Sequence, residues 1–162
     1  MPPSHDDQIR QYAEGPAKLR QALATVPPEA MKWRPAPGKW SVHEVVIHCA
    51  DSETNAHMRV RYILAEKDPT IIGYNQDEWA RVLSYHELPL EPALATIEAV
   101  RANTVPLLRS LSETAWKRTG RHTEYPATPY GMEKWLEVYA SHLDVHCRQI
   151  ARNVEGWKGA RR

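Results

Sequence analysis

Apolar residues recur at three- and four-residue steps over four long segments of the chain, which is the period of amphipathic α-helices. The pattern predicts helices over residues of about 6–26, 41–66, 91–111 and 131–156. Proline- or glycine-containing stretches separate these segments, as expected for the connections between helices. No stretch shows a convincing strand pattern. Four long amphipathic helices favour an all-α fold, a four-helix bundle.

The second predicted helix has the clearest start in the chain. Ser41 followed by Glu44 matches a capping box, in which each side chain bonds the other residue's backbone amide. The link from 67 to 90 is long, with a short helix expected near 75–85. A link of this length can return along the bundle. We therefore expect the second and third helices to run parallel.

Three histidines are candidates for a metal site. His142 and His146 stand four residues apart, which places both rings on one face of the fourth helix, one turn apart. Two imidazoles so placed can share one divalent ion. His48, at the edge of the apolar face of the second helix, would be the third ligand. The spacing alone is equally compatible with helix-face histidines satisfied by hydrogen bonds.

Polar residues beside these histidines are candidates for binding a substrate. Ser52, Asn55 and Arg59 continue the His48 face of the second helix at helical spacing. This stripe suits either the lining of a substrate groove or a solvated face. His122, in the loop before the fourth helix, could approach the metal or the substrate, although an exposed loop histidine is the simpler interpretation.

Other side chains have expected supporting roles. Gln149, one turn after His146, and Asp51 could orient ligand rings. We expect Asp144 to be a surface charge, and His5, His43, His57 and His86 to be surface residues. Cys49 and Cys147 belong to no Cys-x-x-Cys pair and are expected to be reduced packing residues.

Composition narrows the class of protein. The 162 residues suit one domain spanning 1–162, and 42% hydrophobic with 25% charged residues is typical of a globular chain. The net charge of +1 gives no basic excess that would indicate nucleic-acid binding. Because we find neither a signal pattern nor an apolar run long enough for a membrane span, we expect a cytoplasmic protein.

Two motifs resemble a known family. The run Pro37-Gly38-Lys39-Trp40-Ser41-Val42-His43-Glu44-Val45-Val46-Ile47-His48 is similar to the second-helix signature of the DinB-like (YfiT-like) family. The run Tyr139-Ala140-Ser141-His142-Leu143-Asp144-Val145-His146-Cys147-Arg148-Gln149-Ile150 resembles its fourth-helix ending. The resemblance implies an up-down-down-up bundle and a divalent metal held by His48, His142 and His146. Family members include thiol S-transferases and isomerases, and others are named only as metal-dependent hydrolases.

These observations predict a divalent-metal-dependent enzyme, with Zn²⁺ or Ni²⁺ as the expected metal. The resemblance to thiol S-transferases implies that a low-molecular-weight thiol, bound as thiolate, would attack a small electrophilic substrate, and no protein nucleophile or base is evident in the motifs. The alternatives are hydrolysis by a metal-bound water and a non-catalytic metal-binding module. We expect no nucleic-acid or membrane partner, and a homodimer through exposed helix faces is compatible with the sequence.

Overall fold

Four long helices form a bundle in the computed structural model, which describes residues 3–161. They are α1 (His5–Leu23), α2 (Val42–Ala65), α4 (Leu90–Arg109) and α6 (Met132–Gly159). The predicted four-helix bundle is therefore confirmed. Residues 1, 2 and 162 of the predicted domain lie outside the described residues. No helix in the described part of the chain is both long and apolar enough to cross a membrane.

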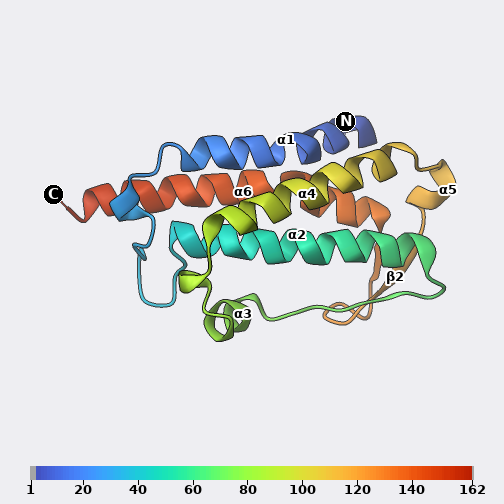
Figure 1. Cartoon of the computed structure of the whole chain (residues 1–162). Helices are drawn as coiled ribbons and strands as arrows, with labels where there is room; N and C mark the ends of the chain where they lie inside the picture. The colour runs from blue at the N-terminus through green and yellow to red at the C-terminus, as the bar shows by residue number, and fades with distance from the viewer. Residues whose placement is uncertain (1–2, 162) are drawn as a thin grey trace.

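The direction of the helices gives the up-down-down-up order. In Figure 1, α1 and α6 run one way along the bundle, and α2 and α4 run the other way. The link between α2 and α4 passes along the outside of the bundle and carries the short helix α3 (Gln76–Val82) and a 3₁₀ turn (Tyr85–Glu87). This return path lets α2 and α4 run parallel, as the length of the link predicts.

A small sheet accompanies the bundle, contrary to the expectation of no strands. Its strands are β1 (Thr70–Ile71), β2 (Thr119–His122) and β3 (Pro129–Gly131), in the order β1-β2-β3. Strand β2 pairs parallel with β1 and antiparallel with β3. Runs of two to four residues are too short to show a two-residue period, and pairing with β1 joins segments about 50 residues apart. Strand β3 leads directly into α6.

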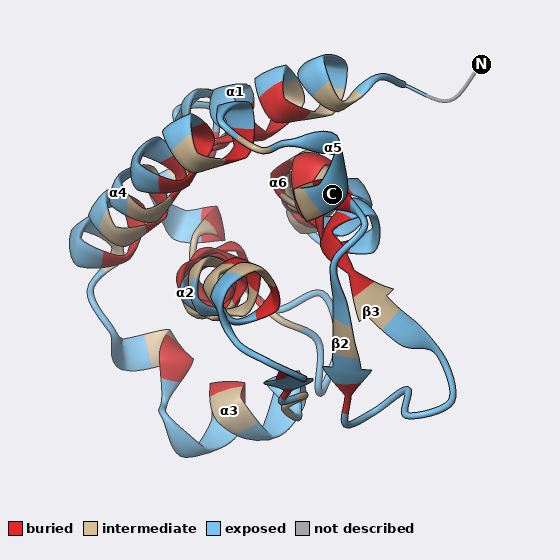
Figure 2. Cartoon of the chain, turned by 90° about the vertical axis from the view of Figure 1, so that its right-hand side faces the viewer, coloured by how far each residue is buried: buried red, intermediate tan, exposed pale blue. Residues whose placement is uncertain are grey.

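The buried faces of the helices form two apolar clusters at different levels of the bundle. Figure 2, which looks along the helices, shows buried residues on the sides that face one another. On α4, Ile97 belongs to one cluster and Val105 to the other, with the buried Arg101 between them. On α6, Ala140 and Leu143 divide in the same way on either side of His142. A polar layer therefore crosses the bundle between the two clusters.

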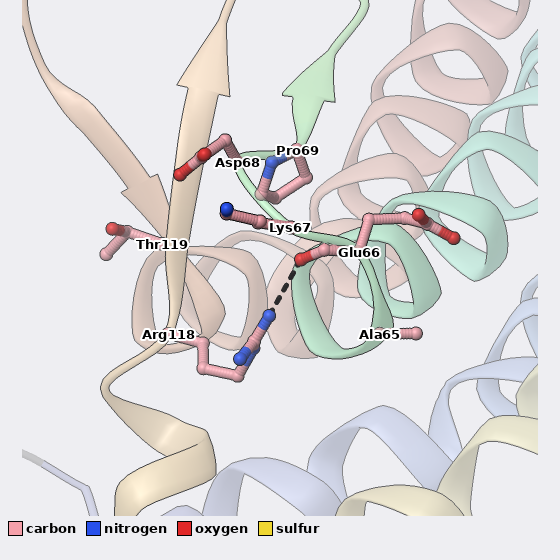
Figure 3. A pocket seen from close by; sticks show the side chains of 7 residues that line it. All are labelled: Ala65, Glu66, Lys67, Asp68, Pro69, Arg118 and Thr119. Carbon is pink, nitrogen blue, oxygen red and sulfur yellow. Dashed lines mark hydrogen bonds between the residues drawn. The ribbon is translucent and has the colours of Figure 1, made fainter.

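Both ends of α2 are held by side chains. At the start, Ser41 accepts from the Glu44 amide, and the Glu44 carboxylate accepts from the Ser41 amide and from Arg34. At the end, Arg118, just before β2, donates to the carbonyl oxygens of Ile63 and Glu66, both at 2.8 Å. Figure 3 shows Arg118 reaching Glu66 across a surface pocket of about 460 Å³. These bonds satisfy carbonyl groups that a helix end leaves unpaired.

The Glu44 carboxylate should make the stability of the bundle sensitive to acid. Burial opposes its ionisation, but hydrogen bonds from Arg34 and Ser41 outweigh burial and lower its pKa to about 2, from 4.5. Because the folded state has the lower pKa, its contribution to stability is complete above pH 4.5 and is lost as pH falls towards 2. Glu44→Gln should therefore cost about 1 kcal/mol at pH 7, and less at pH 3, in urea unfolding.

The matched control is Glu66→Gln, because Glu66 is exposed at the other end of the same helix. This change should leave the pH dependence of unfolding close to that of the wild type. An equal cost for Glu44→Gln at pH 7 and pH 3 would contradict a role for the ionised carboxylate.

Candidate functional site

Three histidine rings converge in the polar layer. His48 lies on α2 and is almost fully buried, while His142 and His146 lie one turn apart on α6. One ring nitrogen from each lies within 4.8 Å of the others. The ring centroids are 4.6 Å apart for His142 and His146 and 4.9 Å apart for His48 and His146. The fold thus brings together the three residues that the sequence selects.

Hydrogen bonds fix the orientation of two of these rings. The Nδ1 atom of His142 donates to Glu53 Oε1 at 3.0 Å, and Nδ1 of His146 donates to Gln149 Oε1 at 2.8 Å. Because Nδ1 is used in each of these bonds, Nε2 is the ring nitrogen left to bind a cation. These two Nε2 atoms face each other at 3.2 Å. Two facing lone pairs repel unless a cation or a proton lies between them.

The protonation state of the rings suits a metal ion. Burial and the two neighbouring imidazoles lower the pKa of His48 to about 2, and burial and His142 lower that of His146 to about 4. Both rings are therefore neutral at pH 7, the form that binds metals. The buried Nδ1 of His48 has no hydrogen-bond partner among residues 3–161. Neutral nitrogen donors, facing lone pairs and an orphaned ring nitrogen together fit a divalent ion.

The Glu53 carboxylate is anchored by a buried arginine. Arg101 donates to both carboxylate oxygens, at 2.9 and 2.6 Å, and also to the backbone carbonyls of Tyr12 and Tyr139. Burial would raise the Glu53 pKa, but the Arg101 charge and the hydrogen bonds from His142 and Arg101 lower it overall. The carboxylate therefore stays ionised inside the bundle and accepts the hydrogen bond from His142 Nδ1.

A polar pocket of about 340 Å³ adjoins the histidines. Ser52 lines it and also lies with Oγ 3.4 Å from His142 Nε2, so it joins the pocket to the cluster. Tyr139, one turn before His142, lines the pocket and contacts the edge of the His142 ring. The other lining residues come from α2, from the α2–α4 link and from the loop between β2 and β3: Arg59, Tyr74, Asn75, Gln76, Asp77, Glu124 and Tyr125.

The sequence model of the DinB superfamily matches residues 11–150, a range that includes all three histidines and the pocket. The chain belongs to the DinB superfamily. Relatives in this superfamily include a protein of Oceanobacillus iheyensis named "putative metal-dependent hydrolase", which is 32% identical over 90% of this chain and 83% of its own length. A protein of the same name from Geobacillus thermodenitrificans is 34% identical over 92% of this chain and 84% of its own.

A solved structure from the same superfamily shares the fold. YfiT from Bacillus subtilis, described as "a probable metal-dependent hydrolase with an unusual four-helix bundle topology", superposes with a TM-score of 0.84 and 28% sequence identity. The similarity covers 92% of this chain and 85% of YfiT. The bundle described above is thus the fold of YfiT, and the names of these relatives agree with a histidine cluster that can hold a metal ion.

The other sequence candidates lie in varied positions within this DinB bundle. Gln149 contacts a histidine of the cluster, whereas the Asp51 carboxylate accepts from the hydroxyl of Tyr85. The Asn55 side chain donates to a backbone carbonyl of its own helix at 2.9 Å and does not line the pocket. The expectation of an exposed loop position for His122 was wrong, because this residue lies in β2 and is buried against Tyr130 and Tyr125. It is outside the histidine cluster.

One of the predicted surface histidines is buried. His43 lies in the first turn of α2, and its Nε2 bonds the carbonyl oxygen of Leu88 at 2.7 Å. The prediction of a surface position was wrong because the end of the α2–α4 link folds over the start of α2. Cys49 is fully buried and Cys147 is half-buried, and both are free thiols. Burial raises the pKa of both thiols, which agrees with the predicted packing role.

The sequence patterns assigned no role to Glu53 and Arg101, whose ion pair lies at the centre of the polar layer. A signal was present for Arg101, because it continues the buried face of α4 at helical spacing from Ile97 to Thr104 and Leu108. A charged residue on a buried face must be paired, so a partner such as Glu53 is required elsewhere in the bundle. Tyr74 carried no comparable signal, because it lies in the link outside any periodic segment.

The Arg101–Glu53 pair should be essential to the stability of the bundle. Arg101→Met leaves the Glu53 carboxylate buried without its partner, and we expect a loss of about 3–5 kcal/mol in chemical unfolding. The double variant Glu53→Leu/Arg101→Met removes both charges and should be more stable than Arg101→Met alone. If the double variant is the less stable of the two, the cost does not come from an unpaired carboxylate.

Proposed function

We propose that this DinB superfamily member is a divalent-metal-dependent enzyme that acts on a small molecule, with His48, His142 and His146 as the metal ligands. The observation that carries this proposal is the convergence of three imidazoles, in which the Nε2 atoms of His142 and His146 face each other at 3.2 Å. Three protein ligands leave coordination positions open, which is typical of catalytic rather than structural sites. Imidazole ligands suit both Zn²⁺ and Ni²⁺.

The contacts of the residues around the three histidines assign each of them a role in this proposal. A divalent ion at these histidines would lower the pKa of a thiol or water and so supply a nucleophile at neutral pH. Glu53 and Gln149 hold the rings of His142 and His146 in their metal-binding orientation. Ser52 and Arg59 line the adjoining pocket and would bind the substrate. Trp40 packs against His48 with ring centroids 4.6 Å apart and shields it from water.

Transfer of a low-molecular-weight thiol is the first candidate reaction. Among the described residues, the buried carboxylate nearest the histidines is Glu53, and it is committed to Arg101 and His142. The two carboxylates that line the pocket, Asp77 and Glu124, are exposed to solvent. No lining carboxylate is therefore buried where it could assist a metal-bound water as a general base, and transfer of an activated thiol needs no such base.

Hydrolysis is the second candidate, because the relatives from Oceanobacillus and Geobacillus are named as metal-dependent hydrolases. A non-catalytic metal clamp is the third. The two apolar clusters on either side of the polar layer argue against a clamp, because they supply the bundle with a core of its own.

His142→Ala should abolish metal binding and turnover while the bundle stays folded. It removes one of three ligands, and the apolar clusters remain intact. The measurements are metal content after purification, far-UV circular dichroism, and conjugation of thiols such as glutathione to monobromobimane before and after chelation. His57→Ala is the matched control, because His57 bonds Thr104 and lies outside the cluster.

Three outcomes separate the candidates. Thiol conjugation that disappears with the metal supports the transferase. If the metal-loaded protein cleaves p-nitrophenyl acetate but conjugates no thiol, the enzyme is a hydrolase and not a transferase. Unfolding of the wild type on chelation, without either activity, would establish the structural clamp.

Gln149→Leu should weaken metal binding without weakening the fold. The change removes the acceptor that holds Nδ1 of His146, and loss of such an outer contact costs roughly 10- to 100-fold in metal affinity. Gln149 lies outside the apolar clusters, so we expect a melting temperature close to that of the wild type. Competition with a coloured chelator measures the affinity. Arg148→Leu, one residue earlier and exposed, should bind metal normally.

A further inference from the structure

Tyr74 carries a buried hydroxyl with no hydrogen-bond partner among residues 3–161. It lies in the α2–α4 link and lines the pocket beside the histidines. Its ring is held in place, because it packs at a tilt of 40° against Trp79 with centroids 4.3 Å apart and lies 5.9 Å from the Arg59 guanidinium carbon. A buried polar group without a partner costs free energy, so a fixed one in a pocket indicates a ligand atom that completes its bonding.

Two further donors line the same pocket. The Tyr139 hydroxyl accepts a hydrogen bond from Arg59 Nη1 at 3.1 Å, which leaves its own proton available to donate. Arg59 makes one other bond, from Nη2 to the carbonyl oxygen of Ile72 at 2.7 Å, and a guanidinium has five N–H donors. These two bonds hold Arg59 in place and leave its other N–H groups available to donate to a ligand. The pocket wall therefore offers two hydroxyl protons and a fixed cation to an acceptor.

None of the other residues that line the pocket places a buried negative charge beside these three donors. Asp77 and Glu124 are exposed to solvent, where water and salt screen their charges. Burial raises the pKa of Tyr74 to about 12 and outweighs the lowering effect of the nearby Ser52 hydroxyl, so the Tyr74 hydroxyl keeps its proton at neutral pH. Ser52 connects this side of the pocket with His142 at 3.4 Å. An oxygen bound at Tyr74 can therefore belong to the same small molecule that reacts at the histidines.

We propose that Tyr74, Tyr139 and Arg59 form an oxyanion subsite, and that the substrate is a carbonyl compound whose oxygen they bind beside the metal site. This inference rests on the proposed function and adds the chemical class of the substrate. As a nucleophile adds to the carbonyl carbon, the C=O π electrons move to oxygen, and the three donors stabilise the negative charge that develops there. Tyr74 and Tyr139 donate hydrogen bonds and keep their protons. No oxidant or reductant is needed.

The test uses phenylphosphonate, whose tetrahedral oxygens resemble such an adduct, in calorimetric titrations of the full chain with and without Zn²⁺. We expect Tyr74→Phe to weaken phenylphosphonate binding about tenfold or more, because a hydrogen bond to a charged group is lost. Zn²⁺ affinity and the melting temperature should not fall, because the hydroxyl makes no hydrogen bond within the described part of the chain. Tyr62→Phe is the matched control, since Tyr62 is 45% exposed on the same bundle and does not line the pocket.

The outcomes separate this subsite from the proposed metal function. If the wild type takes up no Zn²⁺ but binds phenylphosphonate in a Tyr74-dependent way, the metal function fails and the subsite stands. If Zn²⁺ binds but phenylphosphonate binds equally to the wild type and Tyr74→Phe, the subsite is wrong. Loss of stability in Tyr74→Phe would show that the hydroxyl serves the fold and would also overturn it. Absence of phenylphosphonate binding to the wild type in both states has the same consequence.

Discussion

The bidentate ion pair between Arg101 and Glu53 is the interaction on which the site depends. Its two side chains are 1% and 0% exposed, so both charges have lost their water and must be satisfied within the protein. Arg101 meets this demand by bonding Glu53 on α2 and backbone carbonyls on α1 and α6. Gly15 allows the approach, because a Cβ atom there would lie 2.5 Å from Arg101 Nη1. The pair thus ties all four helices at one level.

The same pair reaches the histidine cluster through one hydrogen bond. Glu53 accepts from Arg101 and from His142, so the carboxylate that fixes the ring is itself fixed by the core. This arrangement separates two tasks along the bundle. The apolar clusters above and below supply burial, while the layer between them supplies orientation and charge. A cluster of three histidines can therefore occupy the middle of a small bundle without replacing its core.

The α2–α4 link and the sheet complete the site from outside the bundle. The link brings Tyr74 against the pocket, and the loop between β2 and β3 adds Glu124 and Tyr125. In Figures 1 and 2 these elements lie together on the side of α2 away from α1. The return path that makes α2 and α4 parallel is thus also the segment that walls the pocket. The α2–α4 link thus sets the direction of α4 and also forms part of the pocket wall.

The sequence by itself determined the four helices and the Ser41–Glu44 cap, and it indicated His48, His142 and His146 as candidates, because helical periodicity and capping are local properties. The family motifs added the helix order. Only the tertiary structure decided that Glu53 and Arg101 meet and that short strands pair. It also decided that Tyr74 lies in the pocket. The ion pair joins residues 48 positions apart, and the pairing of β1 with β2 joins residues about 50 positions apart. No local pattern specifies such distant partners. A buried charged or polar group must have a partner, but only the packed bundle determines which residue that partner is.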